Sequence, residues 1–303
     1  MNGTCKLCLN TANLKMSHVM PKFVWRWLRN PVPGGMRTNR VPNQRIQDGL
    51  KTYLLCGDCE QRLSEWEKLF SEKLFIPLHN PEPVTKSIEY GEWALKFAVS
   101  VSWRVLTFFL NENGANHFTP LQHKLTREAL ETWRKFMLGE ISNPGQFEQH
   151  LLPVDVIASY QGPQISPYLN RYMLRSIHID LISTQNSAYV YTKMCRLILF
   201  GRIQEKYPGQ WKGMKLNLRH GSIHPRDYHL PSGIADYMNR KADEAKLILD
   251  SLSPRQQEIV DASFKRNVDS IANSEIFRAM QYDFSYSGKK AFKKETQNGS
   301  NKT

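Results

Sequence analysis

The sequence lacks a long uncharged apolar run. A membrane-spanning helix needs roughly 18 to 20 such residues, and the nearest stretch, 94–110, is interrupted by Lys96 and Arg104. We interpret this stretch as a buried amphipathic helix and expect no contact with a membrane. The chain also begins without an apolar signal segment, because two cysteines and a lysine lie within its first eight residues. The expected location is therefore cytoplasmic.

Cysteine is scarce, with 5 in 303 residues, yet four of the five form two Cys-x-x-Cys pairs, Cys5 with Cys8 and Cys56 with Cys59. In the cytosol such pairs are more often metal ligands than disulfides. Four thiolates form a closed tetrahedral set that suits structural Zn²⁺, so we predict that they bind one zinc ion. In the alternative they are four unrelated buried thiols. We interpret Cys195, within an apolar stretch, as a buried small hydrophobic side chain.

Acidic residues are outnumbered, with 28 Asp and Glu against 41 Lys and Arg, and the formal net charge is +13. Such an excess favours polyanionic partners such as nucleic acid. A basic aromatic run follows Pro21, and more arginines follow that run. The predicted nucleic-acid-binding residues are Lys22, Arg26, Arg29, Arg37, Arg40 and Arg45. In the alternative, Trp25 and Trp27 pack in the core while the arginines face water.

Prolines near residue 80 separate two parts of the chain. We predict a small zinc-bound module over 1–78, a larger domain over 84–284, and a disordered basic tail over 285–303. Apolar periodicity and turn residues predict the elements of the module: strands over 13–19 and 51–55 and helices over 22–29 and 59–75. For the larger domain they predict helices over 89–110, 121–138, 234–252 and beyond Pro254, and strands over 154–160, 172–183, 188–203 and 214–218.

Three segments of the module resemble the HNH, or ββα-metal, nuclease family. Many members have Cys-x-x-Cys before a strand, an acidic residue and histidine followed by x-x-Pro, and Leu-Cys-x-x-Cys-His at a helix start. The matching segments here are Cys-Lys-Leu-Cys at 5–8, Ser-His-Val-Met-Pro at 17–21 and Leu-Cys-Gly-Asp-Cys-Glu at 55–60. The resemblance covers about a quarter of the chain and implies a ββα-metal or treble-clef module there. The residue patterns of the rest predict a mixed domain of helices and an antiparallel sheet, so the expected fold class is α+β.

The resemblance also implies catalytic roles. His18 matches the strand histidine, which acts as a general base on water, while a divalent cation stabilises the scissile phosphate. Ser17 stands where the family has an acid, and Glu60 stands where it has a helix histidine. Glu60 can still bind Mg²⁺ or Mn²⁺ through oxygen. Three side chains could approach this cation: Asn43, Asp48 and Glu67.

We therefore predict a metal-dependent HNH-like endonuclease, with His18, Glu60 and Asn43 as its catalytic residues and DNA as the expected substrate. Such modules occur in restriction and phage-defence systems, where the second domain would recruit or regulate by binding a protein partner or a second copy. In the alternative, His18 is structural and the chain is a non-catalytic nucleic-acid-binding or scaffold protein. A histidine-rich loop suggests either a second metal site or solvated side chains: His220, His224, Asp227 and His229.

Overall fold

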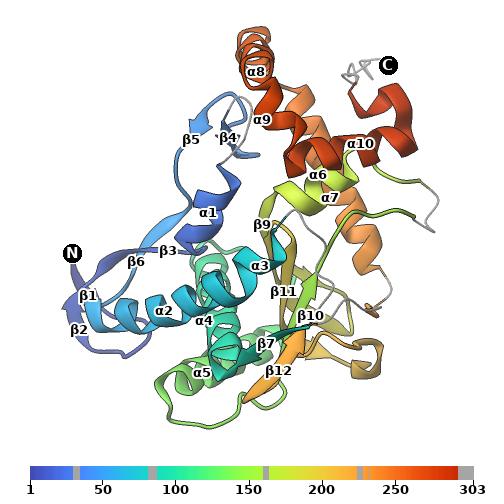
Figure 1. The fold of residues 1–303 in the computed structure, drawn as a ribbon. Coiled ribbons are helices and arrows are strands. Elements are labelled where there is room, and N and C mark those ends of the chain that lie inside the picture. The colour runs from blue at the N-terminus through green and yellow to red at the C-terminus, as the bar shows by residue number, and fades with distance from the viewer. Residues whose placement is uncertain (30–34, 81–86, 160–163, 224–227, 232, 293–303) are drawn as a thin grey trace, which may run out of the picture. The chain divides into compact units, whose positions relative to one another are not determined.

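The computed structural model describes residues 1–29, 35–80, 87–159, 164–223, 228–231 and 233–292, and the protein is mixed α+β (Figure 1). The chain forms two compact units. Unit 1 comprises Met1–Trp27, Asp48–Val154 and Ile177–Pro231, and unit 2 comprises Leu28–Gln47, Asp155–Ser176 and Ser232–Thr303. Each unit is thus built from three separate segments, whereas the predicted domains followed the chain continuously.

The N-terminal part of unit 1 is a set of short strands followed by helices. Its antiparallel pairs are β1 (Asn2–Thr4) with β2 (Thr11–Asn13), and β3 (Lys15–His18) with β6 (Lys51–Leu55). Its helices are α1 (Lys22–Leu28), α2 (Gly57–Phe70), a π-helical turn (Ser71–Phe75) and α3 (Ile76–Leu78). Leu63 and Phe70 of α2 are fully buried, as the apolar periodicity of this helix predicts.

The core of unit 1 is an antiparallel sheet of strand order β8-β11-β10-β9, covered on one face by two helices. Its strands are β8 (Gln149–Pro153), β9 (Ile177–Ser183), β10 (Ser187–Met194) and β11 (Leu197–Glu205). The covering helices are α4 (Glu92–Asn111) and α5 (Pro120–Leu138) (Figure 1). Beside them lie a two-stranded sheet and a 3-10 turn: β7 (Ile88–Gly91), β12 (His220–Ile223) and Pro208–Gln210.

Helix α4 is long and apolar enough to cross a membrane by length and composition, but 67% of its apolar window is buried inside the protein. The interpretation of this stretch as a buried core helix agrees with that packing. Helix α5 has the ends that its sequence predicts. Thr119 and Gln122 form a capping box, and Gly139 adopts the left-handed conformation, φ 80°, that terminates helices.

Unit 2 is mostly helical. Its elements are β4 (Met36–Arg37), β5 (Arg45–Ile46), α6 (Leu169–Arg175), α7 (Ile234–Asp250), α8 (Pro254–Arg266), α9 (Val268–Ala272), α10 (Glu275–Ser287) and a 3-10 turn (Gly288–Ala291). Asp283 of α10 is buried and accepts hydrogen bonds from the backbone N–H groups of Asn170 and Arg171 at the start of α6. The Arg171 side chain pairs with the same carboxylate at 2.8 Å, so one buried ion pair joins α6 to α10.

Several predicted elements need correction. The first part of the strand predicted over 172–183 is helix α6, and 154–159 forms no strand. The strand predicted over 188–203 is a hairpin of two strands, β10 and β11. The chain reverses direction at Cys195, whose backbone has a φ of +56°. The tail predicted as disordered from 285 continues as helix and 3-10 turn to Ala291, which is buried and accepts a hydrogen bond from Arg171. The remaining tail, 293–303, lies outside the described residues.

Candidate functional site

The two Cys-x-x-Cys pairs converge on one point of unit 1. The four Sγ atoms lie within 4.8 Å of one another, and Cys8 and Cys56 are 3.8 Å apart. A tetrahedral zinc site with Zn–S bonds of about 2.3 Å has S–S edges of about 3.8 Å. None of the cysteines forms a disulfide. The four side chains are therefore close enough to bind a metal ion, with a geometry compatible with structural zinc.

Local backbone structure brings the thiols together. The first pair lies in the turn between β1 and β2, where Leu9 donates its N–H to the Cys5 carbonyl at 2.9 Å. The second pair opens α2, and the Cys56 N–H donates to the Cys5 Sγ at 3.4 Å. Burial raises the pKa of the Cys5 thiol, but backbone hydrogen bonds outweigh it and lower that pKa to about 7. Burial and the neighbouring thiols raise the pKa of Cys59. The pKa values of these two thiols thus shift in opposite directions. A bound cation would favour the thiolate form of all four cysteines.

His18 lies at the end of β3 and faces a carboxylate. Its Nε2 is 2.9 Å from Asp48 Oδ1, and the other oxygen of Asp48 is 2.6 Å from Lys51 Nζ. The hydrogen bond from Lys51, followed by the bond with His18, holds the pKa of Asp48 well below its usual range despite some burial. Asp48 is therefore ionised at neutral pH and accepts from both partners. The sequence suggested Asp48 only as a cation ligand, whereas the structure places it as a hydrogen-bond partner of His18.

The two residues that depart from the family pattern have different surroundings. Ser17 is buried, 1% exposed, and its hydroxyl donates a long 3.4 Å hydrogen bond to the Lys15 carbonyl. Glu60 lies in the first turns of α2, and its Oε1 is buried with no hydrogen-bond partner among the described residues. An unpaired buried carboxylate oxygen is costly and calls for a donor or a cation.

Arg104 of α4 also reaches this region. Its Nη1 lies 2.8 Å from Glu67 Oε1 and donates to the His18 carbonyl at 3.1 Å. Glu67, which the sequence suggested as support for a cation, is thus already paired with a guanidinium. The sequence pattern missed Arg104, because an arginine within an apolar helix was read only as an interruption.

Asn43, predicted as a catalytic residue, makes a hydrogen bond within unit 2. It belongs to unit 2, and its side-chain oxygen accepts a hydrogen bond from the Ser253 N–H, at the start of α8, at 2.9 Å. Arg37 makes a second link within unit 2, to Gln256 of α8 at 2.9 Å. The loop between the two cysteine pairs is therefore tied to α8, and Asn43 is used as a structural acceptor there.

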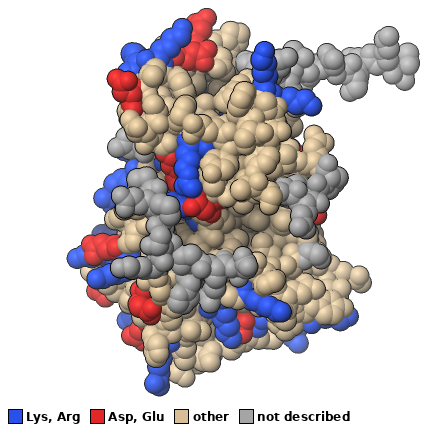
Figure 2. All heavy atoms as spheres, turned by 45° about the vertical axis from the view of Figure 1, so that its right-hand side comes forward, with Lys and Arg blue, Asp and Glu red and all other residues tan. Residues whose placement is uncertain are grey.

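The predicted nucleic-acid-binding residues divide between the units. Lys22 and Arg26 belong to unit 1, and the other four belong to unit 2: Arg29, Arg37, Arg40 and Arg45. All are exposed except Arg37, whose pKa is lowered by burial and by the neighbouring charge of Arg45. Figure 2 shows one face of the protein, on which the Lys and Arg side chains occur in separate small groups, several with acidic residues beside them. The assignment of these residues to nucleic-acid binding stays a prediction.

The aromatic residues of α1 pack against the protein. Trp27 makes edge contacts with Phe75 and His79, at ring-centre distances of 5.9 and 4.4 Å. The Trp25 indole lies against Gly49 so closely that a Cβ added there would be 2.2 Å from Trp25 Nε1. Both contacts favour the structural interpretation of the tryptophans over base stacking. Gly49 also donates its N–H to Asp48 Oδ1 at 2.9 Å, so Trp25 supports the segment that holds the His18 partner.

A second ionised cluster lies at the edge of the main sheet. Glu148 pairs with Lys215 at 2.5 Å, with Arg202 at 3.0 Å and with His150 at 3.4 Å. Burial raises the pKa of Glu148, but these neighbours outweigh it and lower the pKa to about 2. Burial also lowers the pKa of His150, whose ring lies 4.7 Å from that of Trp211. The Glu148 carboxylate is thus surrounded by Lys215, Arg202 and His150, while both His150 ring nitrogens are buried without a hydrogen-bond partner among the described residues. We interpret the cluster as structural.

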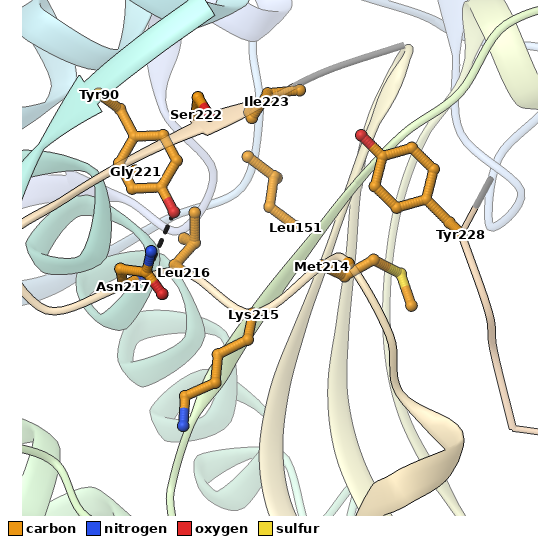
Figure 3. Close-up of a pocket in the computed structure, with 11 residues that line it drawn as sticks. Tyr90, Leu151, Met214, Lys215, Leu216, Asn217, Gly221, Ser222, Ile223 and Tyr228 are labelled. Carbon is orange, nitrogen blue, oxygen red and sulfur yellow. Dashed lines mark hydrogen bonds between the residues drawn. The ribbon is translucent and has the colours of Figure 1, made fainter. Parts of the chain in front are cut away.

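Unit 1 also contains a pocket of about 320 Å³, shown in Figure 3. It is lined by apolar side chains such as Leu151 and Ile223, and the Tyr90 hydroxyl accepts a hydrogen bond from the Asn217 N–H. In Figure 3 the charged end of Lys215 points away from the other labelled side chains. The pocket therefore presents no cluster of catalytic groups among its lining residues.

The histidine-rich loop yields no second metal cluster within the described parts of the chain, where the four cysteines form the one group of three or more close potential ligands. His224 and Asp227 lie outside the described residues. Comparisons with protein-family models, with curated proteins and with solved structures found no match to this chain. Its function must therefore be inferred from the chemistry of its own residues.

Proposed function

We propose that this chain is an HNH-like, metal-dependent endonuclease that cleaves nucleic acid, with DNA as the expected substrate. The observation that carries the proposal is the pairing of His18 with the ionised Asp48 on the strand pair β3–β6, which leads into the second of the two converging cysteine pairs. We place this activity in the cytoplasm, in a restriction or phage-defence setting, as the family resemblance implies. Residues 84–284 are proposed to bind a protein partner or a second copy.

The order of elements supports this proposal. Two antiparallel strands, β3 and β6, lead into α2, and one cysteine pair precedes the first strand while the other opens the helix. A ββα-metal or treble-clef module has this order, and Zn²⁺ would be its structural ion. Zinc held by four thiolates has no open position for substrate. Its role would therefore be to fix β3 against α2, and the chemistry would lie with other residues.

His18 has the arrangement of a general base. Because Asp48 is ionised, it can only accept, so the His18 Nε2 must carry the hydrogen that joins them. The neutral imidazole then has its lone pair on Nδ1, which can take a proton from a water molecule as that water attacks phosphorus. The Asp48 carboxylate also stabilises the imidazolium that forms, as the acidic member of a catalytic triad does.

Glu60 is the residue best suited to hold a hard cation. Its buried Oε1 has no partner among the described residues, whereas the Glu67 carboxylate is already paired with Arg104. Mg²⁺ or Mn²⁺ accepts carboxylate and phosphate oxygens together with water. When bound, such a cation would stabilise the negative charge that develops on the scissile phosphate.

A specific observation favours a second candidate, a non-catalytic nucleic-acid-binding or scaffold protein. Ser17 replaces the family acid and is buried, so it offers no carboxylate beside His18. In this candidate the His18–Asp48–Lys51 chain of contacts serves only to hold the end of the strand pair β3–β6.

Plasmid cleavage in Mg²⁺ or Mn²⁺ separates the two candidates. Wild-type protein should nick or linearise the plasmid, and His18→Ala should slow cleavage by about 100-fold or more, the usual contribution of a general base. Glu60→Ala should abolish cleavage at millimolar metal. His220→Ala and Glu65→Ala are matched controls, because both side chains are exposed within the same unit. Zinc content should be equal in all variants. Cleavage by His18→Ala at the wild-type rate would leave the binding-protein candidate.

A further inference from the structure

The geometry points to Arg104 as a positioning residue of the proposed nuclease site, one that holds His18 and Glu67 in a single arrangement. This inference rests on the proposed function. Arg104 lies in α4, beyond the predicted boundary of the zinc-bound module, and the motif comparison gave it no role. The inference therefore assigns part of the active arrangement to a helix of the unit 1 core.

The guanidinium of Arg104 contacts three elements at once. Its Nη1 carries two hydrogens and meets two acceptors, the His18 carbonyl at 3.1 Å and Glu67 Oε1 at 2.8 Å. Its Nε donates to the Ser100 carbonyl, one turn earlier in α4, at 3.2 Å. Only 3% of the residue is exposed. A planar, buried group with several fixed donors holds its partners with little freedom, so β3, α2 and α4 are locked together at this point.

The contact with His18 fixes the backbone from which the imidazole projects. Arg104 holds the carbonyl group of His18, while Asp48 holds Nε2 of the ring. The next residue, Val19, donates its N–H to the Leu50 carbonyl at 3.0 Å and continues the pairing of β3 with β6. The position of the ring is thus determined at both ends. A base displaced by about 1 Å loses on the order of a hundredfold in rate.

The contact with Glu67 controls which carboxylate is free for a cation. Glu60 and Glu67 are seven residues apart on α2, so they share a helix face, with the buried Leu63 between them. The ion pair with Arg104 neutralises Glu67 and satisfies one of its oxygens. Without Arg104, Glu67 would become a second unpaired carboxylate that attracts cations away from the productive site. Arg104 therefore acts on the base and on metal selection together.

The test uses full-length protein and two substitutions, Arg104→Gln and Arg104→Lys. Lysine keeps the charge and the fold but lacks the planar set of donors, which guards against simple unfolding of the glutamine variant. Arg134→Gln is the matched control. Arg134 of α5 donates to the Leu7 carbonyl, within the first cysteine pair, at 3.2 Å. Like Arg104 it links a core helix to the N-terminal part of unit 1, but it does not contact His18. Zinc content and melting temperature are measured for all three.

Two readouts decide the outcome. Single-turnover cleavage should fall about a hundredfold in both Arg104 variants with unchanged DNA affinity, the Mg²⁺ concentration needed for half-maximal rate should rise, and Arg134→Gln should match wild type. Nitrogen-15 NMR of the imidazoles, with His18 identified from the His18→Ala spectrum, should show the Nε2–H tautomer in wild type and a mixture of tautomers in Arg104→Lys.

The NMR readout needs no cleavage, so it separates this inference from the proposed function. A wild-type protein that does not cut but whose His18 tautomer depends on Arg104 would refute the nuclease and keep the positioning role. An Arg104→Lys protein with an unchanged His18 tautomer would overturn the positioning role. The same conclusion would follow if that variant cut at the wild-type rate.

Discussion

Replacing Gly49 by alanine should impair the proposed site through a purely steric effect. A Cβ at this position would lie 2.2 Å from Nε1 and 2.3 Å from Cε2 of the Trp25 indole. The backbone N–H of Gly49 and the imidazole of His18 both donate to Oδ1 of Asp48. Any shift of Gly49 is therefore passed directly to the carboxylate that orients the base.

The magnitude follows from the overlap. Side-chain carbons essentially never approach within 3.0 Å of another heavy atom, so the indole or the backbone of 48–49 must move by about 1 Å. A displacement of this size at a catalytic group costs on the order of a hundredfold in rate, or about 2.7 kcal/mol of transition-state stabilisation. Overpacking of this kind lowers folding stability by about 1 to 3 kcal/mol.

The assay is cleavage rate and urea unfolding of three variants beside wild type. Gly57→Ala is the matched control, since its Cβ would meet only the flexible end of Lys15 at 3.8 Å, and both quantities should stay at wild-type values. Adding Trp25→Leu to Gly49→Ala should restore much of the rate by opening space. A Gly49→Ala protein with wild-type rate and stability would refute the reasoning, and so would a double variant no better than the single one.

Three further predictions concern the metal, the charge and the pH dependence. Purified protein should contain one zinc per chain, and a strong chelator should unfold the cysteine-bound strands, because such binding contributes on the order of 10 kcal/mol; elemental analysis without zinc would contradict this. Replacing Arg26 and Arg29 together by alanine should reduce the slope of log affinity for DNA against log salt concentration by about 2, because two phosphate contacts are lost. An unchanged slope would show that both arginines only face solvent. The folded pKa of Glu148, about 2, lies below its unfolded value of about 4.3. Glu148 should therefore contribute roughly 3 kcal/mol to the free energy of unfolding above pH 5, and this contribution should be lost as the pH falls toward 2. The free energies of unfolding of wild type and Glu148→Gln, measured in urea, should converge there.

The sequence predicted the parts of this fold whose signals are local. The strand over 51–55, directly before the second cysteine pair, is present, and the helix over 121–138 ends where Gly139 terminates it. The four cysteines were recognisable because metal ligation requires their spacing. The turn at Cys195 was missed, because a non-glycine residue with positive φ gives no pattern in a single sequence.

The contacts of the site residues depend on long-range packing, so they could not be predicted from the sequence. His18 was identified from its motif, but its bond to Asp48 spans 30 residues and its bond to Arg104 spans 86. Asn43 lay at the expected place in the loop, yet the structure uses it to accept from Ser253, 210 residues away. No periodicity or spacing encodes such contacts, because they arise only when separate elements meet.

The interleaving of the two units limits how this chain can be altered by cutting and joining. The polypeptide passes from one unit to the other after Trp27, Gln47, Val154, Ser176 and Pro231. No continuous fragment therefore encodes either unit alone, and a single cut between Leu28 and Pro231 would divide both units, whereas a cut after Pro231 would divide unit 2 alone. Engineering of this chain should therefore proceed by point substitution or by insertion at surface loops.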